Sequence, residues 1–600
     1  MRKERIERLR ERMREENMDA YYIPTNDFHG SEYIHEHFKA REYFSGFDGS
    51  AGTLVITGKE AGLWTDGRYF LQAEEQLKGS GITLYRSGEE KVPTISEYLK
   101  TTLRPGQVLG LDGRLVSAAW YEDMEKQLKR KGITMDGSKD LPGEIWEERP
   151  PQEFHSIWLL SEQYAGESRP KKLQRLQKEL KKEESDAILL TSLDDIAWLF
   201  NARGKDIPCN PVFFSYAVVT QERAWLFTGD GCIYKEDAEK LKTEEIVWKN
   251  YSEFHEFVEN LPFPLEHQRM LVDKHVIDSL TLKKFPDTIE LVDVFCPVTK
   301  WKAQKNKIEC ENVKKAHIQD GIAVTKFIYW LKKNIGSSPM TEISAAQKLE
   351  EYRKEREHYL EPSFDTICGY AEHGAIVHYS ATEETNIPLK PENFLLVDSG
   401  GQYLEGTTDI TRTILLGKEA TKEQKKYYTA VLCGNLRLAA AKFKHGCSGV
   451  SLDYLARQPL WELGCDYNHG TGHGVGYLLN VHEPPNAFRY RILKEADQNA
   501  VLEEGMITSD EPGFYLSGQY GIRLENLILC VKREKTEYGQ FMGFEPLTFV
   551  PFEKDAIDFE QMTKEDKRLL NEYHREVYQK IADGLTKEER EWLAGVCEAV

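Results

Sequence analysis

The stretch "LLVDSGGQYLEGTTDITRTILLG", residues 395–417, contains two apolar runs joined by a polar, glycine-rich segment. Asp398 ends the first run, and Asp409 begins the second. Two strands joined in this way are expected to be antiparallel neighbours, which places both carboxylates side by side near one end of the pair. Because an unpaired carboxylate is costly to bury, such an arrangement needs a compensating partner.

Two more acids end or interrupt apolar runs. Glu511 closes "MITSDE" before a Pro-Gly pair, and Glu525 lies within "GIRLENLILC". Taken one at a time, each of these acids is typical of a solvated strand end. Four together, with a histidine nearby, favour a pair of divalent cations. Carboxylates in this number favour manganese, with cobalt, iron or zinc as alternatives, and two ions roughly 3.5–4 Å apart can share a bridging hydroxide.

The histidine comes from "HGTGHGVG", residues 469–476, in which two histidines are surrounded by small residues. Glycine permits close approach of the backbone to a ligand or to another strand. On its own, the segment is equally typical of a glycine-rich turn with two solvated histidines. The choice between this turn and a metal or catalytic site depends on the rest of the chain.

Bulk composition limits the classes of function. The 600 residues carry a net charge of −20 and are 40% hydrophobic, so we expect no nucleic-acid or anionic-membrane partner. No apolar run approaches the length of a membrane span, and the charged start "MRKERIERLRERMREEN" is unlike a secretory signal. The ten cysteines have no CxxC spacing. We therefore expect reduced, mostly buried thiols and a cytoplasmic location.

A faint internal repeat predicts two tandem α/β domains, residues 1–150 and 151–302. Both copies read as a charged helix, a buried strand, a short helix and a two-stranded hairpin, and "LPGEIWEERPPQ" (141–152) is the expected linker. From about Lys302, amphipathic helices alternate with strands. Residues 303–600 are therefore expected to form an α+β domain with helices on one face of a curved sheet, closed by a charged helical tail.

At this point the chain resembles a known family. The motifs are "LLVDSGGQYLEGTTDITRTILLG", "HGTGHGVGYLLNVHEPP", "TSDEPGFYLSGQYGIRLENL", "FEPLTFVP" and, near the start, "SEYIHEHFKAREYFSGFDGSAGT". They are similar to metal-dependent Xaa-Pro aminopeptidases, also called aminopeptidase P, in the long three-domain form. The resemblance implies two creatinase-like α/β domains followed by a pita-bread α+β catalytic domain.

The resemblance also implies roles for individual residues. Asp409 and Glu525 match the ligands that bridge two metal ions, Asp398 completes one ion, and His473 with Glu511 completes the other. Glu511 also matches the general acid-base partner of the bridging hydroxide.

Three further histidines match family residues that surround the metals without binding them. We expect His469 and His482 to stabilise the transition state and position substrate, and His378 to serve the proline-side pocket or proton transfer. Arg523, on the same strand face as Glu525, is expected to pair with a ligand carboxylate. The cluster "HGSEYIHEH" (29–37) has three histidines, but nothing nearby completes a metal shell, so we expect no ion there.

The expected activity is release of the first residue from peptides with proline at position two, by a homodimer. Prolidase, methionine aminopeptidase and creatinase share the fold. The length argues against a typical prolidase, the tandem domains against methionine aminopeptidase, and the five ligands against creatinase, which works without metal. A catalytically dead pita-bread domain that binds proteins would show degraded ligand positions, and none of the five is degraded.

Overall fold

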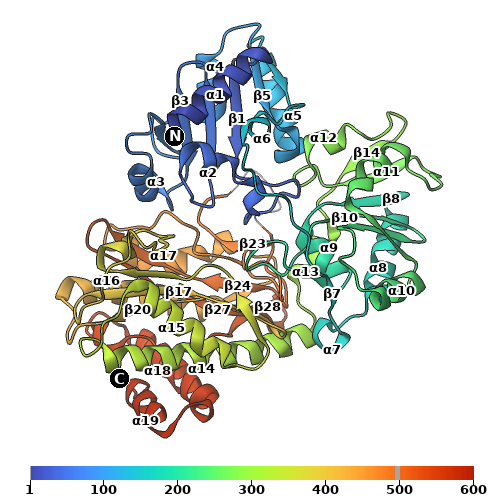
Figure 1. The fold of residues 1–600 in the computed structure, drawn as a ribbon. Helices are drawn as coiled ribbons and strands as arrows, with labels where there is room; N and C mark the ends of the chain where they lie inside the picture. Colours follow the sequence, from blue (N-terminus) through green and yellow to red (C-terminus); the bar gives the residue numbers. More distant parts are fainter. Residues whose placement is uncertain (1, 493–499) are drawn as a thin grey trace. The chain divides into compact units, whose positions relative to one another are not determined.

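The computed structural model describes residues 2–492 and 500–600. The chain divides into two compact units (Figure 1). The first comprises Met1–Leu160 and Glu167–Val298, and the second comprises Ser161–Gly166 and Thr299–Val600.

The first unit contains two six-stranded sheets with the same construction. One has the order β4 (Thr83–Arg86), β3 (Ala61–Thr65), β2 (Thr53–Thr57), β1 (Ala20–Pro24), β5 (Val108–Leu111), β6 (Thr134–Asp136). The other has the order β12 (Ile246–Asn250), β11 (Ala224–Thr228), β10 (Ser215–Thr220), β8 (Ala187–Leu190), β13 (Arg269–Val272), β14 (Glu290–Asp293). In each sheet a central strand pairs antiparallel with the hairpin and parallel with the strand beyond it. The predicted internal repeat is confirmed.

Alternating side chains along β1 explain why helices cover both faces of the first sheet. Tyr21 packs in the core cluster that contains the buried residues of α1 (Arg2–Glu15). Tyr22 belongs to the cluster on the other face, with residues of α4 (Ile95–Thr102) and α5 (Ala118–Lys129). Because successive strand residues point to opposite faces, one buried strand can hold two helical layers.

The predicted linker is wrong in its first part. Residues Leu141–Ile145 form helix α6, whose N-cap Asp140 accepts a hydrogen bond from the backbone N–H of Gly143. Leu141 is buried in the first domain's core. A proline within the first turn does not prevent a helix, and the buried leucine attaches this turn to the core.

The second unit distributes its described strands over several sheets rather than the single curved sheet that was expected. The largest has the order β21 (Lys442–Lys444), β28 (Gly539–Pro546), β27 (Asn526–Thr536), β24 (Ile507–Asp510), β22 (Gly472–Gly474), β23 (Glu483–Phe488). The smaller sheets are β16 (Ile367–Tyr370), β17 (Phe394–Ser399), β20 (Ile410–Leu415); β15 (Tyr359–Pro362), β18 (Gly401–Tyr403), β19 (Gly406–Thr407); and β25 (Gly513–Leu516), β26 (Tyr520–Arg523).

Long amphipathic helices pack against these sheets, as the sequence predicts. They are α14 (Lys307–Asn334), α15 (Glu342–Lys354), α16 (Lys422–Ala439), α17 (Asp453–Trp461), α18 (Lys564–Ile581) and α19 (Lys587–Val596). One core cluster joins α14 and α15 to β17 and β20, and another joins α16 and α18 to β26. In each cluster the apolar faces of two helices cover strands next to the predicted acids.

The fold bears on two predictions made from the composition, the absence of a membrane span and the burial of the cysteines. Within residues 2–492 and 500–600, no helix is long and apolar enough to cross a membrane. The ten cysteines all lie within the described residues and form no disulfide there, and five are buried and five partly buried. The thiols are therefore less uniformly buried than expected.

Candidate metal centre

The first pair of acids lies on two neighbouring strands. Asp398 is on β17, and Asp409 immediately precedes β20. The two strands pair antiparallel with Asp398 opposite Thr411, which confirms the predicted pairing. Their connection is more than a turn, because β18 and β19 join β15 in a separate sheet.

Three candidate ligands approach one another closely. Asp409, His473 and Glu525 each offer one ligand atom, and these atoms all lie within 4.8 Å of one another. His473 Nε2 is 3.5 Å from Asp409 Oδ2 and 3.4 Å from Glu511 Oε1. The ligands come from the start of β20, from β22 and from the segment before β27, so the cluster exists only in the folded chain.

Two of the carboxylates retain oxygens without a donor. Arg523 Nη2 donates to Asp398 Oδ2 at 2.7 Å, and Thr411 Oγ1 donates to Glu525 Oε2 at 2.8 Å. Asp398 Oδ1 and Glu525 Oε1 are buried and accept no hydrogen bond from the described residues. A buried anionic oxygen without a donor is unfavourable unless a cation binds it. With four carboxylates and one imidazole, the donor set fits hard divalent cations.

Burial and neighbouring charges also shift the pKa values of these groups. Burial raises the pKa of Asp398 and holds the pKa of Glu525 well above its ordinary value. Burial also raises the pKa of Glu511 to about 7, against the opposing charge of His473. Burial lowers the pKa of His473, but the hydrogen bond to Asp409 and the charge of Glu511 outweigh it and raise that pKa to about 9. Metal binding must displace the protons that this cluster retains.

Metal binding is therefore expected to release protons and to weaken as the pH falls through about 9 and then about 7, because His473 becomes protonated below its pKa of about 9 and Glu511 below its pKa of about 7. Calorimetry of Mn²⁺ binding in buffers of different ionisation enthalpy measures the number of protons released. The variant Glu511→Gln should release fewer. Affinity that stays constant between about pH 5 and 8 would contradict this expectation.

The same pKa shifts predict how the metal-free fold responds to pH. A group whose pKa is raised by folding contributes stability below its unfolded pKa and loses that contribution as the pH rises through its folded pKa. For Glu511 the loss runs from 4.5 to about 7, and for His473 from 6.5 to about 9. The thermal midpoint of the metal-free wild-type protein should therefore fall as the pH rises. The fall should be larger than the fall for the metal-free Glu511→Gln variant, and circular dichroism measures both midpoints.

Two of the three further histidines contact this cluster or residues bonded to it. The ring of His482 lies 4.2 Å from that of His473, in an edge-on arrangement. His469 Nε2 is 2.8 Å from the hydroxyl of Tyr515, which accepts a hydrogen bond from Arg523 Nη1 at 2.7 Å. His469 is thus linked, through two side chains, to the guanidinium that binds Asp398.

His378 lies in a turn that Arg523 also contacts. The amide of Tyr379 donates to the carbonyl of Ile376 at 3.1 Å, which closes the turn around His378. The carbonyl of the preceding residue, Val377, accepts from Arg523 Nη2 at 3.1 Å. One guanidinium therefore joins the turn of His378 to a candidate metal ligand.

The route by which Arg523 reaches Asp398 differs from the expectation. The apolar run around Glu525 is not one strand, because β26 ends at Arg523 and β27 begins at Asn526 in another sheet. The assumption of a shared strand face with Glu525 is wrong. The chain turns at this break. The guanidinium of Arg523 therefore contacts Asp398, and the carboxylate of Glu525 lies beside Asp409 and His473.

The glycines beside His473 allow neighbouring strands to approach closely, which is one of the two purposes that the sequence allows for them. A Cβ on Gly472 would lie 1.8 Å from the carbonyl oxygen of Ser509, and a Cβ on Gly474 would lie 2.1 Å from that of Glu483. Both contacts are therefore close approaches between β22 and its neighbouring strands. Any larger residue at either position would push His473 out of register.

The histidines of "HGSEYIHEH" are engaged elsewhere, within the first unit. The ring nitrogens of His29 lie 3.0 Å from the carbonyl of Thr191 and 2.8 Å from the hydroxyl of Tyr251. His35 Nδ1 accepts from the backbone N–H of His37, whose own ring bonds the carbonyl of Pro150. These contacts give each of the three rings a structural role.

Comparison with known proteins gives the family. Models of the Creatinase/Prolidase N-terminal domain match residues 5–146 and 148–309, metallopeptidase family M24 matches 311–532, and the C-terminal region of M24 peptidases matches 540–600. A probable Xaa-Pro aminopeptidase P of Laccaria bicolor is 39% identical and covers 99% of this chain and 93% of its own. Xaa-Pro aminopeptidase 1 of Dictyostelium discoideum is 37% identical, with coverage of 96% and 92%. This chain belongs to the Xaa-Pro aminopeptidase P family.

Solved structures agree with membership of this family. The crystal structure of X-prolyl aminopeptidase from Caenorhabditis elegans, a cytosolic enzyme with a di-nuclear active site, superposes with a TM-score of 0.95 at 31% identity over 100% of both chains. An Xaa-Pro dipeptidase from Bacillus anthracis gives 0.51 at 26% identity and covers 64% of this chain. The predicted fold, two creatinase-like domains and a pita-bread domain, is confirmed, and the chain is an aminopeptidase of family M24.

Two side chains of the candidate site were not predicted from the sequence. Thr411 binds Glu525 and lies two residues beyond Asp409, so strand alternation could have identified it. Tyr515 links Arg523 to His469, and no local pattern in "GFYLSG" indicates that role. Burial raises the pKa of Tyr515 to about 12, so it remains a neutral hydrogen-bond donor near pH 7.

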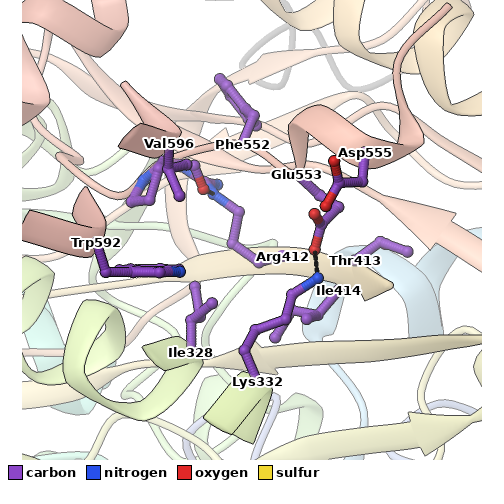
Figure 2. A pocket seen from close by; sticks show the side chains of 11 residues that line it. Ile328, Lys332, Arg412, Thr413, Ile414, Phe552, Glu553, Asp555, Trp592 and Val596 are labelled. Carbon is purple, nitrogen blue, oxygen red and sulfur yellow. Dashed lines mark hydrogen bonds and ion pairs between the residues drawn. The ribbon is translucent and has the colours of Figure 1, made fainter. Parts of the chain in front are cut away.

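A cavity of about 100 Å³ next to β20 contains none of the candidate ligands (Figure 2). The ion pair of Lys332 and Glu553, 2.6 Å long, lies in its wall. Arg412 also lines it and donates to the backbone carbonyl of Glu525 at 2.6 Å. This wall therefore supports the segment that carries Glu525.

Proposed function

We propose that this chain removes the first residue from peptides whose second residue is proline, by metal-dependent hydrolysis. The observation that carries the proposal is the convergence of Asp409, His473 and Glu525, whose ligand atoms lie within 4.8 Å of one another. The names of full-length relatives, Xaa-Pro aminopeptidase P and X-prolyl aminopeptidase, supply the substrate class.

Two divalent ions would be held by five residues. Asp409 and Glu525 would bind both ions, Asp398 would complete one, and His473 with Glu511 would complete the other. Manganese suits this oxygen-rich donor set best, with cobalt, iron or zinc as alternatives. When bound, the ions would supply Lewis-acid polarisation of the scissile carbonyl and activation of water for attack.

The protein's own groups would then move protons and stabilise charge. Glu511 would accept the proton of the attacking water on its carboxylate, as a general base within reach of that water. His469 and His482 would position the substrate and stabilise the charge that develops on its carbonyl oxygen when the carbonyl is attacked. The departing proline nitrogen needs one proton as its bond to carbon breaks, and His378 would serve that side of the site.

The tertiary amide explains why proline needs a dedicated site. A bond to proline nitrogen has no N–H that an extended-strand protease could bind. Selection must therefore come from the shape of the ring and the position of the carbonyl before it. A closed end of the cleft that accommodates a free α-amino group would restrict cleavage to the first residue.

Chelation and metal add-back test this function directly. Peptides of the types Xaa-Pro-peptide, Xaa-Pro dipeptide and Xaa-Ala-peptide are assayed with chelated protein before and after addition of Mn²⁺. We expect chelation to lower the rate on Xaa-Pro-peptides by at least about 100-fold and Mn²⁺ to restore it. Activity that survives thorough chelation would refute the mechanism, and a preference for dipeptides would reassign the chain to prolidase.

A homodimer is part of the proposal. Exposed apolar side chains gather around Trp461, whose ring lies 5.9 Å from those of Tyr454 and Tyr490, with Ile492 also exposed nearby in sequence. An exposed aromatic patch is typical of an interaction surface. Sedimentation equilibrium should give twice the mass of one chain.

We also propose where the protein is located in the cell and where its three domains begin and end. Ten cysteines that form no disulfide within the described residues and the cytosolic C. elegans relative support a cytoplasmic location. We retain residues 1–150, 151–302 and 303–600 as the domain limits, supported by the two complete sheets of the first unit.

A further inference from the structure

A carboxylate outside the candidate ligand set is completely buried. Glu342 begins α15 and has 0% exposure. It accepts hydrogen bonds from the backbone N–H of Tyr370 at 2.8 Å and of Ile387 at 3.3 Å, from the His373 ring at 2.9 Å and from the Tyr379 hydroxyl at 2.9 Å. A carboxylate in the first turn of a helix is also favoured by the helix dipole. The charge of Glu342 is thus fully compensated by local donors.

All these donors lie at the edges of, or within, the segment that carries His378. Tyr370 ends β16, and Ile387 follows the loop that returns from His378. Tyr379 comes directly after His378, and its ring packs against Ile367 and Leu396. Glu342 therefore binds the start of this segment, its end and the residue next to His378.

The other side of the same turn is bound to the candidate metal centre. Val377, which precedes His378, accepts a hydrogen bond from Arg523 at 3.1 Å. Arg523 in turn binds Asp398. The backbone around His378 is thus fixed at two points, one through Arg523 and one through the contact between Tyr379 and Glu342.

We propose that Glu342 is a positioning residue for His378 and acts through the hydroxyl of Tyr379. Glu342 sets the place of the Ile376–Tyr379 turn, and Arg523 aligns that turn with the ligand carboxylates. The inference rests on the proposed function, in which His378 serves the proline side of the scissile bond. The buried hydrogen bonds of Glu342 would thus fix the position of His378, one catalytic side chain of that function.

The variant Tyr379→Phe tests this link because it removes the hydroxyl and keeps the packed ring. A 1 Å misplacement of a reacting group can cost about 100-fold, so we expect loss of one anchor to lower kcat/KM on Xaa-Pro-peptides by about 10-fold without loss of metal. Tyr359→Phe is the control, because it breaks a partly buried tyrosine–glutamate hydrogen bond, 2.6 Å long, to Glu350 on the same helix. It should change kcat/KM by less than about 2-fold.

A double-mutant cycle separates positioning from general stability. If Tyr379 acts through His378, the combination of Tyr379→Phe with His378→Ala should be no slower than His378→Ala alone. Multiplicative losses, unchanged kcat/KM in Tyr379→Phe, or an equal loss in Tyr359→Phe would each overturn the inference.

Hydrogen exchange supplies a readout that needs neither metal nor substrate. In metal-free protein, the backbone amide of residue 379 should exchange about 10-fold faster in Tyr379→Phe than in wild type. The same increase is expected in Glu342→Gln if that variant folds. Unchanged exchange in Tyr379→Phe would overturn the inference. Failure of wild-type protein to cleave any Xaa-Pro-peptide would instead overturn the proposed function, and the exchange result would still decide whether Glu342 fixes this turn.

Discussion

Glu525→Gln is expected to lose its bound metal and to lower kcat/KM by at least about 1,000-fold, which corresponds to about 4 kcal/mol of transition-state stabilisation. Glu525 Oε1 is buried without a hydrogen-bond partner among the described residues, and the side chain lies in the same cluster as Asp409 and His473. Glutamine keeps the shape and can still accept from Thr411. It cannot supply the negative charge that would neutralise two cations.

The same substitution should leave the metal-free protein as stable as wild type or more stable. Replacing one buried acid with a neutral amide relieves the burial of a charge and, to a lesser extent, the repulsion from Asp409, which together raise the pKa of Glu525. Wild type, but not Glu525→Gln, should gain thermal stability when Mn²⁺ is added, because ligand binding stabilises the folded state. Elemental analysis and differential scanning calorimetry measure both effects.

The control is Glu545→Gln, which removes a partly exposed carboxylate paired with Lys314 at 2.7 Å. It should retain metal and activity. If Glu525→Gln kept both ions and normal turnover, Glu525 would not be a ligand, and the bridging role would have to be reassigned.

His469→Ala is expected to keep both metal ions and to lower kcat by about 1,000-fold, within the range found for general acid-base groups. His469 is absent from the cluster of close ligand atoms. Its Nδ1 lies 2.7 Å from the carbonyl of Gly470, and its Nε2 lies 2.8 Å from the hydroxyl of Tyr515. These contacts orient the ring without burying it, so truncation should not disturb the fold.

Metal content and single-turnover rates together distinguish a ligand from a catalytic side chain. Tyr515→Phe should retain the ions and lose about 10-fold in kcat, because His469 remains but loses its orienting hydroxyl. His445→Ala, which removes a half-exposed histidine paired with Glu503 at 3.0 Å, should change neither quantity. Simultaneous loss of metal and turnover in His469→Ala would contradict the proposed division of roles.

Much of the fold follows from local patterns. The two creatinase-like domains could be predicted because each repeats a charged helix, a buried strand and a hairpin in the same order. The antiparallel pairing that brings Asp398 opposite Thr411 could be predicted because two apolar runs are joined by a short connection. Both predictions depend on periodicity and proximity along the chain, which the sequence records directly.

The predictions from the sequence were wrong where the pattern of apolar residues does not follow the path of the backbone. The run around Glu525 is continuous in hydrophobicity, yet the chain leaves one sheet at Arg523 and enters another at Asn526. Leu141 appears in a proline-containing linker, yet it is buried in the first core. Hydrophobicity predicts that a residue is buried, but it does not predict which sheet or core receives it.

By itself, the sequence determined the types of side chain available for chemistry, the repeated domains and the resemblance to a metallopeptidase family. The tertiary structure alone decided which atoms meet, such as Arg523 with Asp398, Tyr515 with His469 and Glu342 with Tyr379. The physical reason is that these partners are far apart along the chain. Their approach depends on how strands and helices pack against one another, which no local spacing of residues specifies.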